Sequence, residues 1–263
     1  MSMAIKRPKA KKRHRYQHGL PPGIALAWGL VNKSRRGPKP GHTLEEIVGT
    51  AIQLADKQGI SDLSLPRIAA LLGLSRNALY RYVGSKDELL VVIYDAAWGS
   101  PPKYLSRAGT WRKRVRAWTL AVIQGYRNRP WLLDVPIVGS PATPNVLKWL
   151  EALLRSMSGS DLDAADCLRC ALLLDGYARS VVRLSRDVDA GGQTQKQADE
   201  VNAFLLSLLR RRQYPTLASI MSGGQYGFKE SPVADVEFGL NCILDGIDRL
   251  IGRRKAFART RLR

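Results

Sequence analysis

The stretch LSRNALYRYV, residues 74–83, gathers several side chains that can bind a polyanion. On an ideal helix, which turns by about 100° per residue, Arg76, Asn77, Tyr80 and Arg81 fall within about 140° of one another. An arginine can bind guanine through two hydrogen bonds, an asparagine can bind adenine in the same way, and a tyrosine hydroxyl can reach a phosphate. The pattern predicts a short helix that packs through one face and leaves the other face free for a nucleic acid.

A second helix and a glycine turn precede this stretch. Ser64 is the predicted cap of a helix over residues 65–72, which Gly73 ends, and Ser75 is the predicted cap of the helix that runs to about Tyr82. The two short helices carry apolar residues at positions where they can meet. Such a pair forms a helix-turn-helix, which can present its second helix to the major groove of DNA.

Longer helices are predicted on both sides of the helix-turn-helix. Thr43 and Glu46 have the spacing of a capping box at the start of the first flanking helix, and Gly59 is its predicted end. Gly84 and Ser85 lead into the second, KDELLVVIYDAAW. We expect these two helices to hold the recognition helix rigidly.

The residues just described carry a resemblance to a known family. Residues 43–99, and most specifically the portion GLS…ALYRYVGSKDELL, resemble the N-terminal domain of TetR/AcrR-type transcriptional regulators. The remainder resembles the general all-helical C-terminal plan of that family, in its tetracycline-repressor branch. The resemblance implies an all-α fold: a helix-turn-helix DNA-binding domain of three helices followed by a larger helical bundle.

The resemblance also implies roles for individual residues. Arg76, Asn77 and Arg81 occupy positions that in the family face base edges or adjacent phosphates, and Tyr80, Tyr82 and Lys86 occupy positions that reach phosphate. The candidate DNA-binding residues of this domain are Ser64, Arg67, Ser75, Arg76, Asn77, Tyr80, Arg81, Tyr82 and Lys86.

Three positions leave alternatives open. Tyr82 suits the core as well as a DNA contact, and Arg67 suits a solvated surface charge equally well. Pro66 stands where some relatives carry a polar base reader. Proline is compatible with a first helical turn, but its side chain cannot hydrogen-bond a base. Base reading would then depend more on Arg76, Asn77 and the N-terminal arm.

The charge of the chain is strongly positive and unevenly distributed. Lys plus Arg number 42 against 22 Asp plus Glu, a net charge of +20. Residues 1–40 hold eleven basic residues and residues 253–263 hold six, with no acidic residue in either segment. Such a field attracts polyanions. Arg35, Arg36 and Lys39 are candidates for an arm that enters the minor groove; the alternative is a disordered, solubilising end.

Three domains are expected. Residues 1–42 form a basic arm that contains a short apolar helix within residues 20–31, which we expect to pack near the DNA-binding domain. The DNA-binding domain spans residues 43–99, and a helical ligand-binding and dimerisation domain spans residues 100–263. Helices of that last domain are expected near residues 107–129, 143–157, 162–186, 194–212 and 233–252.

In the family, the C-terminal half forms the dimer. Two apolar helical stripes could build a four-helix interface between subunits, although both could instead face the core of their own chain. A dimer would suit a pseudo-palindromic operator in double-stranded DNA. The interface candidates are Leu168, Leu172, Leu240, Ile243, Leu244, Ile247 and Leu250.

The same half holds the effector pocket in the family, and its aromatic residues are the candidate lining. Aromatic residues at helical spacing also suit a core. The candidates for the binding of an unidentified small-molecule effector are Trp111, Trp118, Tyr126, Trp131, Trp149 and Tyr177.

The sequence argues against several other functions. Cys167 and Cys170 lie in an apolar helix, where cysteine acts as a small hydrophobic residue, and the three histidines all precede residue 43, so neither a metal site nor a catalytic triad is expected. No phosphate-binding glycine motif occurs, and we expect neither an enzyme nor a cofactor. No apolar run is long enough to span a membrane and no signal peptide is evident.

The sequence therefore predicts a bacterial, cytoplasmic, nucleoid-associated regulator of transcription. The leading interpretation is a ligand-responsive dimeric repressor that a small molecule releases from its operator. The alternative is a constitutive DNA-binding, architectural or partner-scaffolding protein without an effector.

Overall fold

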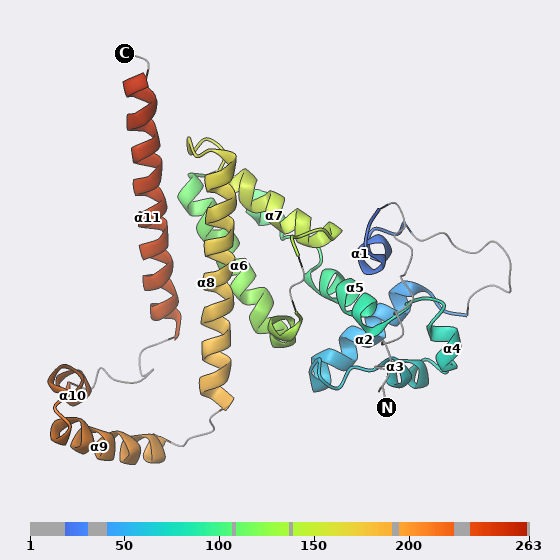
Figure 1. The fold of residues 1–263 in the computed structure, drawn as a ribbon, viewed down its shortest axis with the longest axis horizontal. Helices are drawn as coiled ribbons and strands as arrows, with labels where there is room; N and C mark the ends of the chain where they lie inside the picture. Colours follow the sequence, from blue (N-terminus) through green and yellow to red (C-terminus); the bar gives the residue numbers. More distant parts are fainter. Residues whose placement is uncertain are drawn as a thin grey trace, which may run out of the picture. The chain divides into compact units, whose positions relative to one another are not determined.

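A computed structural model describes residues 19–30, 41–106, 109–136, 139–190, 195–223 and 232–261 (Figure 1). The described residues form α-helices and two short 3₁₀ helices and contain no strand, which confirms the expected all-α fold. The arm residues Arg35, Arg36 and Lys39 lie outside the described residues. The helices are α1 (Pro22–Ala27), α2 (Leu44–Gln58), α3 (Leu65–Leu71), α4 (Arg76–Leu79), α5 (Lys86–Trp98), η1 (Lys103–Ser106), α6 (Trp111–Asn128), η2 (Pro130–Asp134), α7 (Pro144–Ser156), α8 (Ala164–Ala190), α9 (Gln195–Arg211), α10 (Pro215–Ser222) and α11 (Pro232–Arg261).

The chain divides into two compact units. The first unit comprises the described residues up to Pro101 together with Asp134–Glu151, and the second comprises Pro102–Leu133 and the described residues from Ala152 onward. The division that the sequence suggested, between residues 99 and 100, did not include the return of the chain to the first unit. The first division, after Pro101, lies within two residues of the suggested one, and the returning segment ends inside α7, after Glu151.

Local capping signals start and stop the helices of the first unit. The Thr43 hydroxyl accepts a hydrogen bond from the Glu46 backbone N–H at 3.2 Å, and the Glu46 carboxylate accepts one from the Thr43 N–H at 3.1 Å. This is the predicted capping box. Gly59 follows the last turn of α2 with a φ of 81°, a conformation that glycine adopts without strain. The predicted extent of α2 is confirmed.

The helix-turn-helix consists of α3, the turn at Gly73 and α4. Pro66 lies in the first turn of α3, as its restricted φ allows, but the Ser64 side chain makes no capping hydrogen bond, contrary to expectation. The Ser75 hydroxyl does cap α4, accepting from the Ala78 N–H at 3.2 Å. Gly73 has a φ of 64° and lets the chain reverse between the helices.

The helix α4 is shorter than predicted. It ends at Leu79, whereas the sequence suggested an end near Tyr82. The chain continues in a tight turn, in which the N–H groups of Tyr82 and Val83 both donate to the Leu79 carbonyl. The turn brings Val83 into the core beside Leu79, and both side chains are fully buried. Burial of Val83 and the start of the next helix at Ser85 together explain why α4 stops early.

The apolar segment contains α1, which packs on α5 of the DNA-binding domain, near which packing was predicted (Figure 1). At Gly23 an added Cβ would lie 3.0 Å from the Val91 Cβ and 3.1 Å from the Glu88 Cα, so glycine permits the close approach of the two helices. Leu26 is buried in this contact.

Three other apolar residues of this segment keep part of their surface exposed. Ile24 is half-buried, and Trp28 and Leu30 keep 46% and 39% of their surface exposed. The Trp28 indole N–H donates to the Ala142 carbonyl at 2.7 Å. A hydrogen bond therefore helps to hold the end of α1 although the Trp28 ring is largely exposed.

The segment Asp134–Glu151, in which the chain returns to the first unit, is held to α5 by polar and aromatic contacts. The buried Asp95 carboxylate accepts from the backbone N–H groups of Asn145 and Val146, at 2.8 and 3.1 Å. Trp149 packs edge-on against Trp98, with ring centroids 5.3 Å apart. Asp95 thus caps the positive end of α7 from a neighbouring helix.

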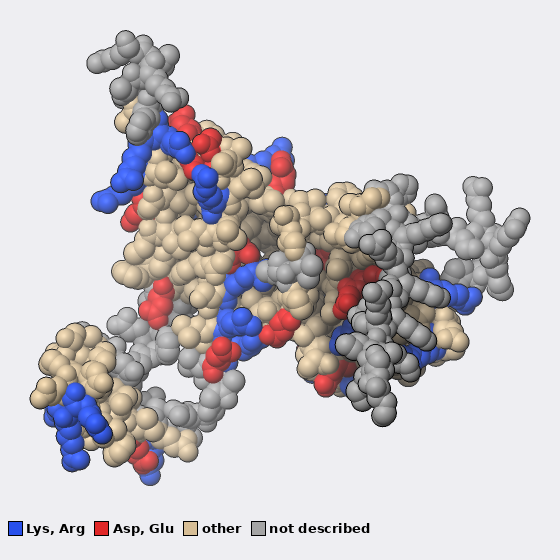
Figure 2. All heavy atoms as spheres, viewed as in Figure 1, with Lys and Arg blue, Asp and Glu red and all other residues tan. Residues whose placement is uncertain are grey.

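The second unit is built on α6, α8 and α11. The five helices predicted between residues 100 and 263 are present as α6, α7, α8, α9 and α11, although α8 and α11 run further than expected and α10 was not predicted. Ion pairs join Arg112 of α6 to Asp245 of α11, and Arg254 of α11 to Asp166 near the start of α8. Figure 2 shows basic and acidic side chains together near the C-terminal end of α11.

No helix in the described part of the chain is both long enough and apolar enough to cross a membrane.

Candidate nucleic-acid interface

The polar residues of the recognition segment are exposed, and the apolar residues beneath them are buried. Arg76 and Asn77 project from α4 and Arg81 from the turn that follows, and all three are exposed. Leu79, between them in sequence, has no exposed surface. The figure of all atoms shows Lys and Arg side chains on the side of this unit where α4 lies (Figure 2). The structure thus brings together the polar face that the sequence predicted.

Arg76 and Tyr80 contact each other. An Arg76 guanidinium nitrogen donates to the Tyr80 hydroxyl at 3.4 Å, and the guanidinium carbon lies 5.7 Å from the centre of the tyrosine ring. Cation–π contact and the hydrogen bond both restrict the arginine side chain. The spacing of four residues could have revealed this pair, because residues i and i+4 are neighbours on a helix.

Lys86 is the first residue of α5 and is exposed. The preceding Ser85 hydroxyl accepts from the Glu88 N–H at 3.1 Å, and the Glu88 carboxylate accepts from the Gly84 N–H at 2.8 Å. These two hydrogen bonds hold the chain between α4 and α5 in place. Lys86 is thereby held beside a helix N-terminus, where the backbone N–H groups also favour an anion.

The residues with alternative interpretations lie at the margins of this surface. Arg67 is exposed on α3, and Ser64 is half-buried at the start of that helix. Tyr82 is half-buried, which suits either a core role or a DNA contact. Pro66 is exposed, so its ring lies at the surface without a hydrogen-bonding group.

The six aromatic candidates for the effector pocket do not form one group. Trp149 belongs to the first unit, where its indole N–H donates to the Gly99 carbonyl at 3.1 Å. Trp118, Tyr126 and Trp131 are buried in the second unit, and Trp111 is half-buried there.

Tyr177 has structural contacts of its own in the second unit. Its hydroxyl donates to the Val236 carbonyl at 2.8 Å. Burial raises the pKa of the Tyr177 phenol. The ring lies against the backbone of α11, and these contacts connect α8 to α11.

A polar cluster that the sequence did not suggest lies beside Tyr126. Its hydroxyl donates to the Asp175 carboxylate at 3.3 Å, and Arg179 donates to the same carboxylate at 2.7 Å. The Arg179 guanidinium carbon lies 5.0 Å from the centre of the Tyr126 ring. The cluster joins α6 to α8 through half-buried charges among aromatic side chains.

The interface candidates separate into three groups by their exposure. Leu168 and Leu172 on α8 are 51% and 76% exposed. Leu240, Leu244 and Ile247 on α11 are buried within this chain, so their stripe serves the chain's own core, the alternative that the sequence left open. Ile243 and Leu250 are half-buried.

Cys167 and Cys170 are partly or fully buried in α8, whereas Cys242 is exposed. Cys170 is buried, and burial raises the pKa of its thiol. Burial also raises the pKa of the Cys167 thiol, with nearby Asp163 adding to the effect. Within the described residues no cluster of histidine, cysteine and acidic side chains could hold a metal ion.

A helix-turn-helix with an exposed polar recognition segment, attached to an all-helical second unit, defines a class of DNA-binding regulators. Comparison with known proteins identifies the family. Residues 47–93 match the family described as bacterial regulatory proteins, tetR family, and residues 104–251 match the tetracyclin repressor-like C-terminal domain. The chain belongs to the TetR family of transcriptional regulators.

Characterised relatives extend over most of the chain. It is 32% identical over 246 residues, 88% of its length and 87% of the relative's, to the HTH-type transcriptional repressor DrrR1 of Streptomyces coeruleorubidus. An HTH-type transcriptional regulator of Saccharopolyspora erythraea is 26% identical over 80% of this chain and 86% of its own.

The fold also matches solved structures of ActR from Streptomyces coelicolor. Apo ActR has a TM-score of 0.65 at 21% identity, covering 82% of this chain and 99% of ActR. ActR in complex with actinorhodin has a TM-score of 0.64 at 22% identity, covering 79% and 95%.

Proposed function

We propose that this protein is a dimeric repressor that binds a pseudo-palindromic operator and is released by a small molecule. The observation that carries the proposal is the exposed face of Arg76, Asn77 and Arg81 above the buried Leu79. A rigidly seated polar helix of this kind suits the major groove. The relative DrrR1 is named a transcriptional repressor, which supports repression rather than activation.

Within this proposal the exposed residues divide into base readers and phosphate binders. Arg76 and Asn77 read base edges, Tyr80 and Lys86 bind phosphate, and Arg81 serves either purpose. Ser64, Arg67, Ser75 and Tyr82 supply marginal contacts. The basic arm with Arg35, Arg36 and Lys39 adds affinity in the adjacent minor groove.

The dimer forms through the exposed side of α8 together with the neighbouring side of α11. Leu168, Leu172 and Leu173 of α8 are all more than half exposed, and Phe238 of α11 is 74% exposed. The two helices pack on each other within the chain, through Tyr177 among others. Four helices, two from each subunit, then bury these side chains. The half-buried Ile243 and Leu250 border this interface, and Leu240, Leu244 and Ile247 do not take part.

The effector binds in the second unit near the cluster of Tyr126, Asp175 and Arg179. Binding sites for small molecules combine apolar and aromatic walls with a few convergent polar groups. Buried Trp118 and Trp131 supply aromatic surface in the same unit. The fold shared with ActR, which was solved in complex with actinorhodin, supports a small-molecule ligand for this protein. Trp149 is left out because it belongs to the first unit.

The test begins with selection of duplexes from a random DNA library on the full chain. A selected duplex is then labelled, and its affinity is measured by fluorescence anisotropy with and without actinorhodin and other small molecules. We expect a symmetric consensus and at least one compound that weakens binding about tenfold or more, the coupling typical of allosteric proteins. The variant Arg76→Ala/Asn77→Ala should lose the consensus while retaining weak binding to all duplexes.

The alternative function makes a different prediction in the same experiment. A constitutive DNA-binding protein would bind with little sequence preference, and no compound would weaken binding. If a symmetric consensus is found but no compound weakens binding, the proposed response to a ligand is wrong, and the proposed binding of DNA as a dimer stands.

A further inference from the structure

The helices α9 and α10 form a hairpin that keeps many apolar side chains exposed. They lie side by side, and α9 packs chiefly on α10 (Figure 1). Arg210 of α9 donates to the Ser222 hydroxyl of α10 at 3.1 Å, and Ala218 and Met221 of α10 are buried. The exposed large apolar residues of the hairpin are Val201, Phe204, Leu208, Tyr214, Leu217 and Ile220. Apolar surface gathered in this way marks an interaction site.

Three of these residues form a stripe along α9. Val201, Phe204 and Leu208 keep 52%, 67% and 36% of their surface exposed. Their spacing, three residues and then four, is that of a coiled-coil seam. The other leucines of α9, which are half-buried, are Leu205, Leu206 and Leu209. The stripe is therefore left uncovered by α10, and a second helix laid along it would bury apolar surface.

Charged residues of opposite sign lie beyond the two ends of this stripe. Glu200 directly precedes Val201, and Arg211, the last residue of α9, lies about one turn after Leu208; both charged side chains are exposed. Positions 200 and 211 are about three turns apart, so the two charges lie along the same edge of the helix. Figure 2 shows basic side chains at one end of this hairpin and an acidic one toward the other, with uncharged surface between them.

This arrangement is complementary to itself. In a two-fold contact, residue i of one copy meets residue j of the other, and j meets i. When two α9 helices run antiparallel, Glu200 of each copy lies opposite Arg211 of the other, and the two stripes face each other. A parallel pairing would bring the two glutamates together at one end and the two arginines together at the other. The charges therefore favour a second copy of α9 in the antiparallel orientation.

We propose that α9 binds the α9 of a second copy in antiparallel orientation, through the apolar stripe and two ion pairs between Glu200 and Arg211. The contact shares no residue with the dimer surface proposed on α8 and α11. A chain with two separate self-complementary surfaces assembles into a tetramer. One tetramer can then bind two operators, a consequence that rests on the proposed function, whereas the contact between α9 helices does not.

Charge reversal in the full chain tests the contact, with sedimentation velocity over a range of concentrations as the measurement. Glu200→Arg and Arg211→Glu each place like charges opposite each other, and each should weaken tetramer formation about tenfold or more. The double variant Glu200→Arg/Arg211→Glu should restore it. Because the two positions are about three turns apart on one helix, they cannot pair within a copy. Restoration therefore identifies a contact between copies, and a double variant as weak as the single ones overturns the proposal.

A second variant tests the apolar stripe. Phe204→Glu places a charge at its centre and should reduce the tetramer to the proposed dimer, with an unchanged circular dichroism spectrum because the side chain is 67% exposed. The matched control is Tyr104→Glu, at an aromatic residue of the second unit that is 45% exposed, and it should leave the assembly unchanged. The inference is wrong if Phe204→Glu associates as the wild type does, or if the control loses as much.

Other results separate this inference from the proposed function. If Phe204→Glu yields monomers while Leu172→Ala leaves the assembly unchanged, the proposed dimer surface is wrong and the contact between α9 helices stands. If no duplex is selected, operator binding fails, and sedimentation still decides whether the contact exists. If Phe204→Glu abolishes binding to vesicles of anionic phospholipid but leaves sedimentation unchanged, the stripe meets a membrane surface and the inference is wrong.

Discussion

Arg76, Asn77 and Arg81 of the first unit point to solvent from a short, firmly seated segment, whereas Tyr126, Asp175 and Arg179 of the second unit contact one another between two helices. In the first case the fold leaves polar groups available to a partner. In the second, the fold already gives them hydrogen bonds. Under the proposed function, a ligand of the second unit would have to compete with these internal contacts, while DNA would meet a surface that needs little rearrangement.

This contrast teaches where the two activities can be altered. Changes to exposed residues of the first unit should affect binding without affecting stability, because their side chains contribute little to the core. Changes to the internally bonded residues Tyr126, Asp175 and Arg179 of the second unit should affect stability and binding together.

The largest expected change in stability comes from the buried residue beneath the recognition helix. Leu79→Ala removes a fully buried side chain and should lower the free energy of unfolding by about 2–5 kcal/mol. Leu172→Ala, at a leucine that is 76% exposed, should leave the stability of the subunit within about 0.5 kcal/mol of the wild type. Urea denaturation monitored by circular dichroism measures both.

Sedimentation adds a second comparison for the same pair of variants. Leu172→Ala should weaken self-association under the proposed dimer, and Leu79→Ala should not. Equal losses of stability in the two variants would contradict the burial assigned to them.

The next prediction separates base reading from phosphate binding on the exposed surface. Arg76→Ala should cost about 1–3 kcal/mol of binding free energy and relax the preference at one base position, because a bidentate contact is lost. Lys86→Ala should weaken all duplexes about equally and reduce the salt slope by about one. Anisotropy titrations at several salt concentrations, on the selected duplex and on point variants of it, distinguish the two. If both variants change the base preference and the salt dependence of binding in the same way, the assignment of Arg76 to bases and Lys86 to phosphate is wrong.

Inside the second unit, Gly239→Ala tests the contact between α8 and α11. An added Cβ would lie 2.6 Å from the Tyr177 hydroxyl oxygen and 2.9 Å from a ring carbon, so the tyrosine must move and weaken its bond to the Val236 carbonyl. We expect a loss of about 1–3 kcal/mol in the free energy of unfolding. Gly246→Ala is the matched control on the same helix, because no atom lies within 4 Å of the corresponding Cβ. If the control loses as much stability, the close contact is not the cause.

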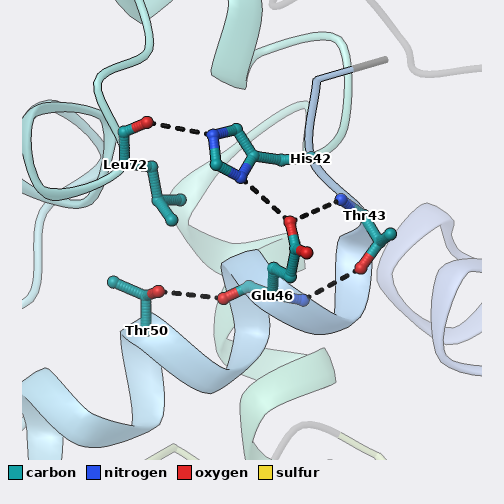
Figure 3. Close-up of polar contacts among 5 residues, drawn as sticks. All are labelled: His42, Thr43, Glu46, Thr50 and Leu72. Atoms are coloured by element: carbon teal, nitrogen blue, oxygen red, sulfur yellow. Dashed lines mark hydrogen bonds and ion pairs between the residues drawn. The ribbon is translucent and has the colours of Figure 1, made fainter. Parts of the chain in front are cut away.

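How much could be read from the sequence also differs between the units. Thr43 and Glu46 (Figure 3), Gly59, Gly73 and Ser75 are local signals that act within a few residues, and they located the first unit's helices. The early end of α4 could not be read in this way, because it depends on the burial of Val83 in the tertiary core.

In the second unit the periodicity of α11 showed that one face is apolar but not which surface covers it. Leu240 and Leu244 turned out to face their own chain. Pro215 was ambiguous because proline both interrupts a helix and begins one, and here it begins α10. The cluster around Asp175 required the packing of α6 on α8, which sequence spacing does not specify.

The smallest effect is expected at Trp28, where the first unit combines exposure with an internal contact. The side chain is 46% exposed, yet its indole N–H donates to the Ala142 carbonyl at 2.7 Å. Trp28→Ala should lower the free energy of unfolding by about 0.5–1.5 kcal/mol, the usual net value of one hydrogen bond. Trp28→Phe keeps a ring but lacks the N–H and should lose nearly as much. Leu30→Ala, at a neighbour that is 39% exposed, should lose less. Chemical denaturation of the three variants tells whether the bond or the ring holds α1 in place, since full recovery in Trp28→Phe would assign the anchor to packing.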